Sequence, residues 1–163
     1  MQKIVSVLVF LLFAALASSG FAADLTALDR IHVLMHREKV LDIMGSPAEE
    51  STASHDLKVD IYHIPDATPL NQAGCLYNSQ NILVGQSFVF EGHNGAQIHE
   101  YLQKLGFIPL MKGDSIGRLA GFDDDAAHSL VAVIERHGDL TTITTFEHGF
   151  YKERVKQNLG QGK

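Results

Sequence analysis

Cysteine is almost absent from this chain, since Cys75 is the one cysteine among 163 residues. A single thiol cannot build a disulfide framework within the domain. Cys75 can still be a small buried apolar residue, one half of an intermolecular disulfide, or a reactive thiol. No activating base stands beside it in the sequence, which favours the buried apolar residue.

Long hydrophobic runs are also missing, with one exception at the amino terminus. Residues 4–17 are apolar apart from Ser6, follow the basic Lys3, and precede a group of small residues that ends at Ala22. The run is too short to span a membrane comfortably, and the three parts are typical of a cleavable signal peptide. Cleavage after Ala22 places small residues at both positions that signal peptidase requires.

These observations predict the organisation of the chain. We expect a signal peptide over residues 1–22, a single domain over 23–159 and a flexible tail over 160–163. No second apolar stretch reaches transmembrane length, so no membrane-spanning helix is expected after processing. The predicted location is the periplasm or the extracellular medium.

Positive charge is scarce in the part that is expected to remain. Lys3 is the one charged residue of the predicted signal peptide, so 12 of the 13 basic residues and all 19 acidic residues stay, a net charge of −7. Nucleic-acid backbones and anionic membrane surfaces bind positive patches. The composition therefore argues against both as partners.

Two helices are predicted at the beginning of the domain. Over residues 24–35, apolar side chains recur at helical spacing after Asp24, which can cap the helix. A second, shorter helix carries Val40 and ends at Gly45. A third, central helix follows Asn94 in a capping-box pattern.

The rest of the domain is predicted to be mostly strand. Residues 65–80, which surround Cys75, have a loop-like composition. The expected strands are 57–64, 82–91, 107–111, 117–122, 130–136 and 140–146. The last two flank Gly138-Asp139 as a hairpin in which Ile134 faces Ile143 and Val131 faces Phe146. A closing helix is expected from about residue 150 to 158.

The order of these elements predicts an α+β fold. We expect an antiparallel β-sheet with the two N-terminal helices and the central helix packed on one face.

One histidine pair has the spacing of a candidate metal site. His32 and His36 have the i, i+4 spacing that places two imidazoles on one helix face, where a third ligand would complete a zinc site. Val33 stands where a catalytic glutamate would follow the first histidine, and a break between the two helices would destroy the register. The other histidines are scattered, which favours ordinary surface positions over a metal site.

Three other residues form a candidate hydrolase triad. Ser115 lies in a Gly-Asp-Ser-Ile sequence similar to the opening motif of GDSL-type lipases and esterases, and Asp125 and His128 form a D-x-x-H pair. Ser115 would be the nucleophile, His128 the base and Asp125 the orienting acid. That family separates the two motifs by a whole doubly wound sheet, whereas about a dozen residues separate them here. The spacing therefore argues against the triad.

One stretch resembles a known family. Residues 35–47, MHREKVLDIMGSP, followed by a strand that carries Tyr62, resemble the SmpA/OmlA (BamE-like) family of small envelope proteins over about residues 28–91. Leu34 stands where that family usually has glycine, and no lipid-bearing cysteine follows the signal peptide. The resemblance implies a two-helix plus antiparallel-sheet fold and a non-catalytic role in the envelope through protein contacts.

The sequence therefore predicts an exported, non-catalytic binding or accessory module of the bacterial cell envelope, without a cofactor. A protein partner is expected to dock at an aromatic groove near Tyr62, Tyr77 and Phe88. The alternative is a metal-binding protein or hydrolase built from scattered His, Asp and Ser residues.

Overall fold

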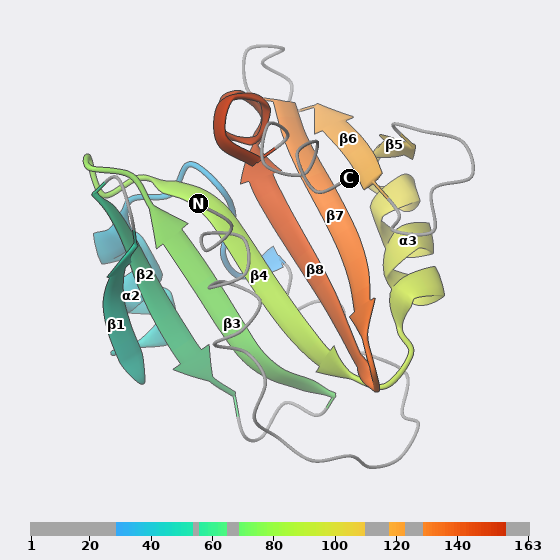
Figure 1. Ribbon diagram of the computed structural model, residues 1–163, viewed down its shortest axis with the longest axis horizontal. Coiled ribbons are helices and arrows are strands. Elements are labelled where there is room, and N and C mark those ends of the chain that lie inside the picture. Colours follow the sequence, from blue (N-terminus) through green and yellow to red (C-terminus); the bar gives the residue numbers. More distant parts are fainter. Residues whose placement is uncertain (1–28, 54–55, 65–68, 110–117, 123–128, 156–163) are drawn as a thin grey trace.

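The fold is that of an α+β protein built on one antiparallel sheet. The computed structural model describes residues 29–53, 56–64, 69–109, 118–122 and 129–155. Eight strands follow the order β1-β2-β3-β4-β8-β7-β6-β5, and all neighbours are antiparallel (Figure 1). The strands are β1 (Glu49–Ala53), β2 (Leu57–His63), β3 (Leu70–Tyr77), β4 (Leu83–Glu91), β5 (Ile108–Pro109), β6 (Arg118–Phe122), β7 (Ser129–His137) and β8 (Leu140–Glu147).

The described helices are short. They are α2 (Arg37–Met44), α3 (Gly95–Lys104), α4 (His148–Phe150) and the π-helix η2 (Tyr151–Val155). Of the residues that the structure describes, none belong to a helix with the length and apolar character needed to cross a membrane.

The predicted hairpin is confirmed in its register. β7 and β8 pair so that Ile134 lies opposite Ile143 and Val131 lies opposite Phe146. Gly138 takes the turn with φ +61°, a conformation in which glycine has no steric penalty. The alternation of β-branched residues and the short turn together fixed this pairing locally, so it could be predicted without knowledge of the rest of the fold.

The first predicted helix is wrong over the part of it that the structure describes. Residue 29 is in a 3-10 conformation, residues 30–35 follow as bends, turns and irregular backbone, and Leu34 adopts φ +77°, which interrupts any α-helix. The backbone instead pairs with the start of β4: the Leu34 N–H donates to the Leu83 carbonyl (2.8 Å), and the Leu83 N–H donates to the Met35 carbonyl (2.8 Å). Ile31, one of the apolar residues at helical spacing, is fully buried in the core although it is not part of an α-helix.

The predicted loop over residues 65–80 is also wrong, because it contains β3. Residues 65–68 lie outside the described ranges, and Leu70–Tyr77 pair with β2 on one side and β4 on the other. Asn71, Gln72 and Gly74 have weak intrinsic strand preference. The strand forms because two neighbouring strands satisfy its backbone groups, a tertiary effect that local composition does not reveal.

The central helix α3 is confirmed, but its start differs from the prediction. The Asn94 side chain makes no capping hydrogen bond to the helix; its Nδ2 donates to the Glu91 carbonyl (2.6 Å). The Asn94 N–H donates to the Thr141 hydroxyl (2.9 Å), which ties the start of α3 to β8. At the other end Gly106 has φ +93° and the Phe107 N–H donates to the Leu102 carbonyl (3.0 Å), a typical helix stop.

Helices α2 and α3 pack on the same face of the sheet, which we call the helix face (Figure 1). Val40 from α2 and Ile98 and Leu102 from α3 join the main core with inward residues of the central strands. The helix face therefore buries the apolar side of both helices, as hydrophobic burial requires. Its largest fully buried side chains include Tyr77 and Phe90.

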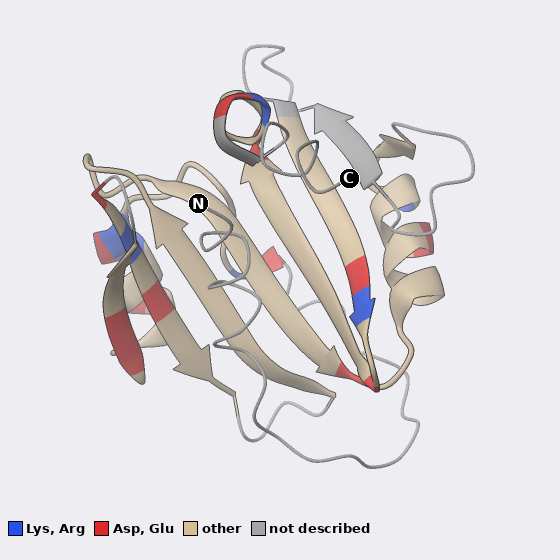
Figure 2. Cartoon of the chain, in the orientation of Figure 1, with Lys and Arg blue, Asp and Glu red and all other residues tan. Residues whose placement is uncertain are grey.

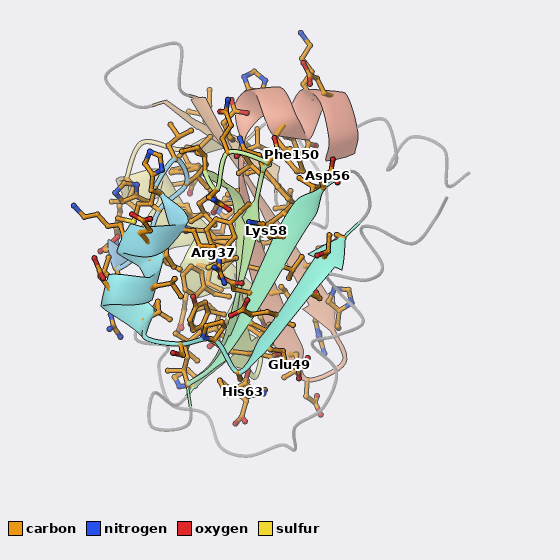
Figure 3. All side chains as sticks on the ribbon, turned by 90° about the vertical axis from the view of Figure 1, so that its left-hand side faces the viewer. Arg37, Glu49, Asp56, Lys58, His63 and Phe150 are labelled. Atoms are coloured by element: carbon orange, nitrogen blue, oxygen red, sulfur yellow. The ribbon has the colours of Figure 1, made fainter. Side chains whose placement is uncertain are left out.

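The opposite face of the sheet is also apolar. It carries two smaller clusters, one around Val59 and Leu76 and one around Val131 and Phe146, and Phe150 of α4 packs against both. Glu147 positions α4, because its carboxylate accepts hydrogen bonds from the Gly149 and Phe150 N–H groups (both 2.7 Å). Figure 3, turned toward the β1 edge, shows α2 and the Phe150 helix on different sides of the sheet.

Two glycines on the opposite face differ in the space that surrounds them, and substituting each one tests how closely this face is packed. A Cβ at Gly85 would lie 3.0 Å and 3.2 Å from two ring carbons of Phe146, whereas a Cβ at Gly74 would meet only the Ser87 Cβ at 3.8 Å. We expect Gly85→Ala to lower the free energy of unfolding by about 1–3 kcal/mol through overpacking. Gly74→Ala, the matched control, should leave it unchanged or slightly raised. Urea denaturation of both variants measures the difference, and equal stabilities would contradict this account of the face.

Candidate functional site

A row of polar side chains crosses the helix face. Across β1, β2, β3, β4 and β8, successive register partners are Glu50, Asp60, Cys75, Gln86 and Thr145. We call these five residues the polar row. Apolar residues of the core flank the row, so its buried members lie in a medium where charge and unpaired polar atoms are disfavoured.

Arg37, the first residue of α2, compensates the charge of the row. Its Nε donates to Asp60 Oδ2 (2.7 Å) and its Nη2 donates to Asp60 Oδ1 (3.0 Å), a bidentate pair. Nη2 also lies 3.1 Å from Glu50 Oε2, and the guanidinium carbon lies 6.0 Å from the centre of the Tyr77 ring. Figure 3 shows Arg37 between α2 and the sheet.

This contact fixes α2 on the sheet. The Asp60 side chain is 2% exposed, and a carboxylate at that depth needs a paired and hydrogen-bonded counterion. The hydrogen bond to Asp60 is the main cause that raises the pKa of Arg37 above its ordinary value, and the guanidinium stays charged. One side chain thereby joins α2, β1 and β2.

The other ionisable groups of the site are held neutral. Burial raises the pKa of the Cys75 thiol to about 12, and burial is likewise the main cause that raises the pKa of Tyr62 to about 12. Burial also raises the pKa of Tyr77. A thiolate is the nucleophilic form of cysteine, so the Cys75 thiol is inert near neutral pH. Cys75 is a free, buried cysteine, in agreement with the apolar interpretation.

Three buried polar atoms of this region stand out. The hydroxyls of Tyr62 and Tyr77 and the Oε1 of Gln86 make no hydrogen bond to any residue that the structure describes. The two hydroxyls and the Cys75 thiol nevertheless interact with one another, because contacts of the Tyr77 hydroxyl with Tyr62 and with Cys75 contribute to the pKa values of all three groups. Orphaned buried polar atoms are uncommon in folded proteins and require an explanation.

The aromatic groove expected at Tyr62, Tyr77 and Phe88 must be corrected. The structure does bring the three side chains into one cluster, but that cluster is the main core. They are 3%, 0% and 2% exposed, so they offer no open groove. The period-2 pattern of the strands places them on the helix face, where α2 and α3 cover the sheet.

The histidine pair loses the helical register on which it depended. Leu34, with its positive φ, lies between His32 and His36, and His36 is the extended residue immediately before α2. His32 is exposed, with its Nδ1 3.1 Å from the Val33 carbonyl. In the described part of the chain, no group of three or more His, Cys, Asp or Glu residues is arranged to hold a metal ion. Ser115, Asp125 and His128 lie outside the described residues.

Sequence reasoning missed Arg37, Asp60 and Gln86. A signal for Asp60 was present, because it stands between the apolar residues Val59 and Ile61 and two residues before Tyr62 on the same face of the strand. A buried carboxylate needs a cation. The identity of that cation could not be read from the sequence, since Arg37 lies 23 residues away and reaches Asp60 only through the packing of α2.

Comparisons of the chain with models of protein families, with curated proteins and with solved structures found no match.

Proposed function

We propose that this chain is an exported, non-catalytic binding or accessory module of the bacterial cell envelope. We further propose that it binds a protein partner by pairing an extended segment of that partner with the free edge of β1. The carrying observation is the exposure of β1: four of its five residues are exposed, and among the described strands β2 is its one neighbour in the sheet. An open strand edge is a template for strand addition.

The two ends of the sheet differ in ways that favour β1. The strand at the other end, β5, has two residues, and one of them is Pro109, which lacks an N–H donor. β1 contains no proline and offers five residues of backbone. Proline and shortness are devices that protect an edge from pairing, so β1 is the less protected edge.

The edge is also held in place before any partner arrives. Arg37 contacts Glu50 on β1 and Asp60 on β2 and so braces the outer pair of strands from the helix side. A binding segment that is already ordered loses less conformational entropy on association. β1 carries two exposed acidic residues, Glu49 and Glu50 (Figure 2), of which Glu50 is paired with Arg37. The charge of Glu49 favours a partner segment that carries positive charge.

The chemistry of the polar row supports a non-catalytic role. Its thiol and the two neighbouring hydroxyls are held protonated by burial, and its carboxylate Asp60 is engaged by Arg37. A general base or nucleophile needs a pKa near the working pH and access to a substrate. The described groups are better suited to holding α2 on the sheet.

The resemblance to the SmpA/OmlA (BamE-like) family adds support through one backbone feature. The family usually has glycine at the position of Leu34, and Leu34 adopts φ +77°, a conformation that favours glycine. Val40 is fully buried, and the helix ends at Gly45 with φ +79°. The resemblance assigns these roles to both residues: Val40 packs on the sheet, and Gly45 ends the helix. Envelope proteins of that family act through protein contacts.

A photo-crosslinking residue at position 52 of β1 tests the proposal. Expressed with its full leader, the protein is irradiated in intact cells and crosslinked species are identified by mass. We expect a reproducible partner band from position 52 and none from position 97, an exposed position of α3 that serves as the matched control. Equal crosslinking from both positions, or no crosslink from position 52, would refute binding at β1.

A further inference from the structure

The side chains of β1 alternate between the two faces of the sheet. Three of them lie across from β2 residues of the apolar cluster around Val59 and Leu76, and so belong to the opposite face: Glu49, Ser51 and Ala53. Ala53 is half-buried and packs against that cluster, whereas Glu49 and Ser51 are exposed. Because successive side chains of a strand point to opposite faces, Glu50 and Thr52 lie on the helix face.

The beginning of β1 is negatively charged on both faces. Glu49 makes no ion pair with the described part of the chain, and Figure 3 shows it at the start of the strand. Glu50 Oε2 lies 3.1 Å from Arg37 Nη2, but the same guanidinium makes two hydrogen bonds to Asp60. One cation thus serves two carboxylates, so the helix face also retains a formal negative charge at this end of β1.

The end of β1 has a different character. Thr52 and Ala53 are uncharged, and the register partner of Thr52 is Lys58, whose Nζ donates to Asn81 Oδ1 (2.7 Å). Ala53 adjoins the apolar cluster of the opposite face. The strand edge therefore has a direction, from two carboxylates at its start to an apolar border flanked by a cation at its end.

A strand added beside β1 would meet these features in a fixed order. All neighbouring strands of this sheet are antiparallel, and antiparallel pairs are slightly more stable per residue than parallel ones. An antiparallel segment meets Ala53 first and Glu49 last. An apolar side chain opposite Ala53 would extend the apolar cluster outward. Basic side chains opposite Glu50 and Glu49 would each have a carboxylate directly across the ladder, at a Cβ separation of about 5 Å.

We propose that β1 selects an extended partner segment in which an apolar residue is followed, after two intervening residues, by two consecutive basic residues, and that this segment runs antiparallel to β1. Because this pattern describes the segment that the β1 edge binds, it rests on the proposed function. A second copy of β1 fits the edge less well. In a symmetric pair centred on Ser51, Glu49 would face Ala53 and Glu50 would face Thr52, so no carboxylate would gain a cation.

Two peptides of identical composition test the pattern. One contains Val-Thr-Ser-Lys-Lys and the other Lys-Lys-Ser-Thr-Val, each with the same short Gly-Ser flanks and blocked ends. Each is titrated into the purified protein, expressed with its full leader, and followed by the backbone amide NMR signals. We expect the first peptide to shift the signals of β1 and to bind about fivefold more tightly than the second, because only the first brings two cross-strand charge pairs and the apolar contact together.

Glu49→Lys assigns the charge pairing to β1. It should weaken binding of the first peptide by about fivefold, and replacing the last lysine of that peptide with glutamate should restore binding to this variant. Glu100→Lys is the matched control, since it makes the same change of net charge on α3, at the other side of the sheet from β1 (Figure 1). Binding to the control should change by less than about twofold, because salt screens distant exposed charges.

The outcomes separate the pattern from binding at β1 itself. Equal binding of both peptides at β1, or tighter binding of the reversed peptide, would overturn the pattern and leave edge binding intact. So would the absence of peptide binding in a protein that still crosslinks a partner from position 52. Concentration-dependent shifts of the β1 signals without peptide would assign the edge to a second copy and would also overturn the pattern. Failure of both the peptides and the crosslink would refute the two proposals together.

Discussion

Arg37→Met is expected to lower the free energy of unfolding by about 3–5 kcal/mol, because it leaves the Asp60 carboxylate buried without a counterion. Methionine retains much of the apolar stem of the arginine, so the loss reports chiefly on the charge and its hydrogen bonds. The Asp60 side chain is 2% exposed and receives two hydrogen bonds from the guanidinium, which makes this pair the most demanding polar contact of the described structure. Urea denaturation at neutral pH measures the change.

The double variant Arg37→Met with Asp60→Leu shows whether the lost stability comes from the unpaired carboxylate or from disturbed packing around it. Replacing both members of a buried ion pair with apolar groups is often neutral or stabilising, so most of the lost stability should return. Lys58→Met is the matched control: the Lys58 Nζ donates to Asn81 Oδ1 (2.7 Å) in an exposed contact, and its loss should change stability by less than about 1 kcal/mol. A single Arg37→Met variant as stable as the Lys58→Met variant would contradict the role assigned to the pair.

The second large expected effect is a loss of stability at alkaline pH. Burial raises the pKa of Cys75 from 9.0 to about 12 in the folded protein, and the unfolded chain retains the ordinary value. Between those values the unfolded state has released a proton that the folded state keeps, so rising pH favours unfolding. The contribution of the neutral thiol is fully present below pH 9 and is lost as the pH approaches 12, by at most about 4 kcal/mol.

Denaturation at a series of pH values from 8 to 12 measures this loss, and Cys75→Ala identifies its source. Because alanine also leaves a small cavity, the comparison uses the slope of stability against pH and not the stability at one pH. The slope should become shallower in the variant, while the remaining loss reflects the raised pKa values of the tyrosines Tyr62, Tyr77 and Tyr101. Parallel slopes for the two proteins would show that the thiol is not buried as described.

Much of the fold could be predicted because its signals are local. The β7–β8 hairpin combines alternating β-branched residues with a glycine turn, and α3 has an apolar stripe that ends at a glycine. The two errors have a common cause. Residues 29–35 and β3 take their conformation from backbone partners in distant strands, Leu83 for the first and β2 and β4 for the second.

The candidate site was less accessible to sequence reasoning. Tyr62 and Tyr77 were correctly placed together, but their aromatic character suggested a binding groove when the helices in fact cover them. The Arg37–Asp60 pair depends on how α2 docks, and the free edge of β1 depends on the order of strands in the sheet. The segment Glu49–Ala53 is short and polar, so its sequence alone does not predict a strand.

The proposed role of β1 is tested most directly by proline at two adjacent positions, Ser51→Pro and Thr52→Pro. Successive N–H groups of an antiparallel edge strand point alternately toward the neighbouring strand and away from it. One substitution therefore removes an outward donor, and the other removes a donor to β2. The account predicts that the outward substitution abolishes capture of the envelope partner while urea denaturation shows unchanged stability, and that the inward one lowers stability. Full capture by the outward variant would contradict partner binding at β1.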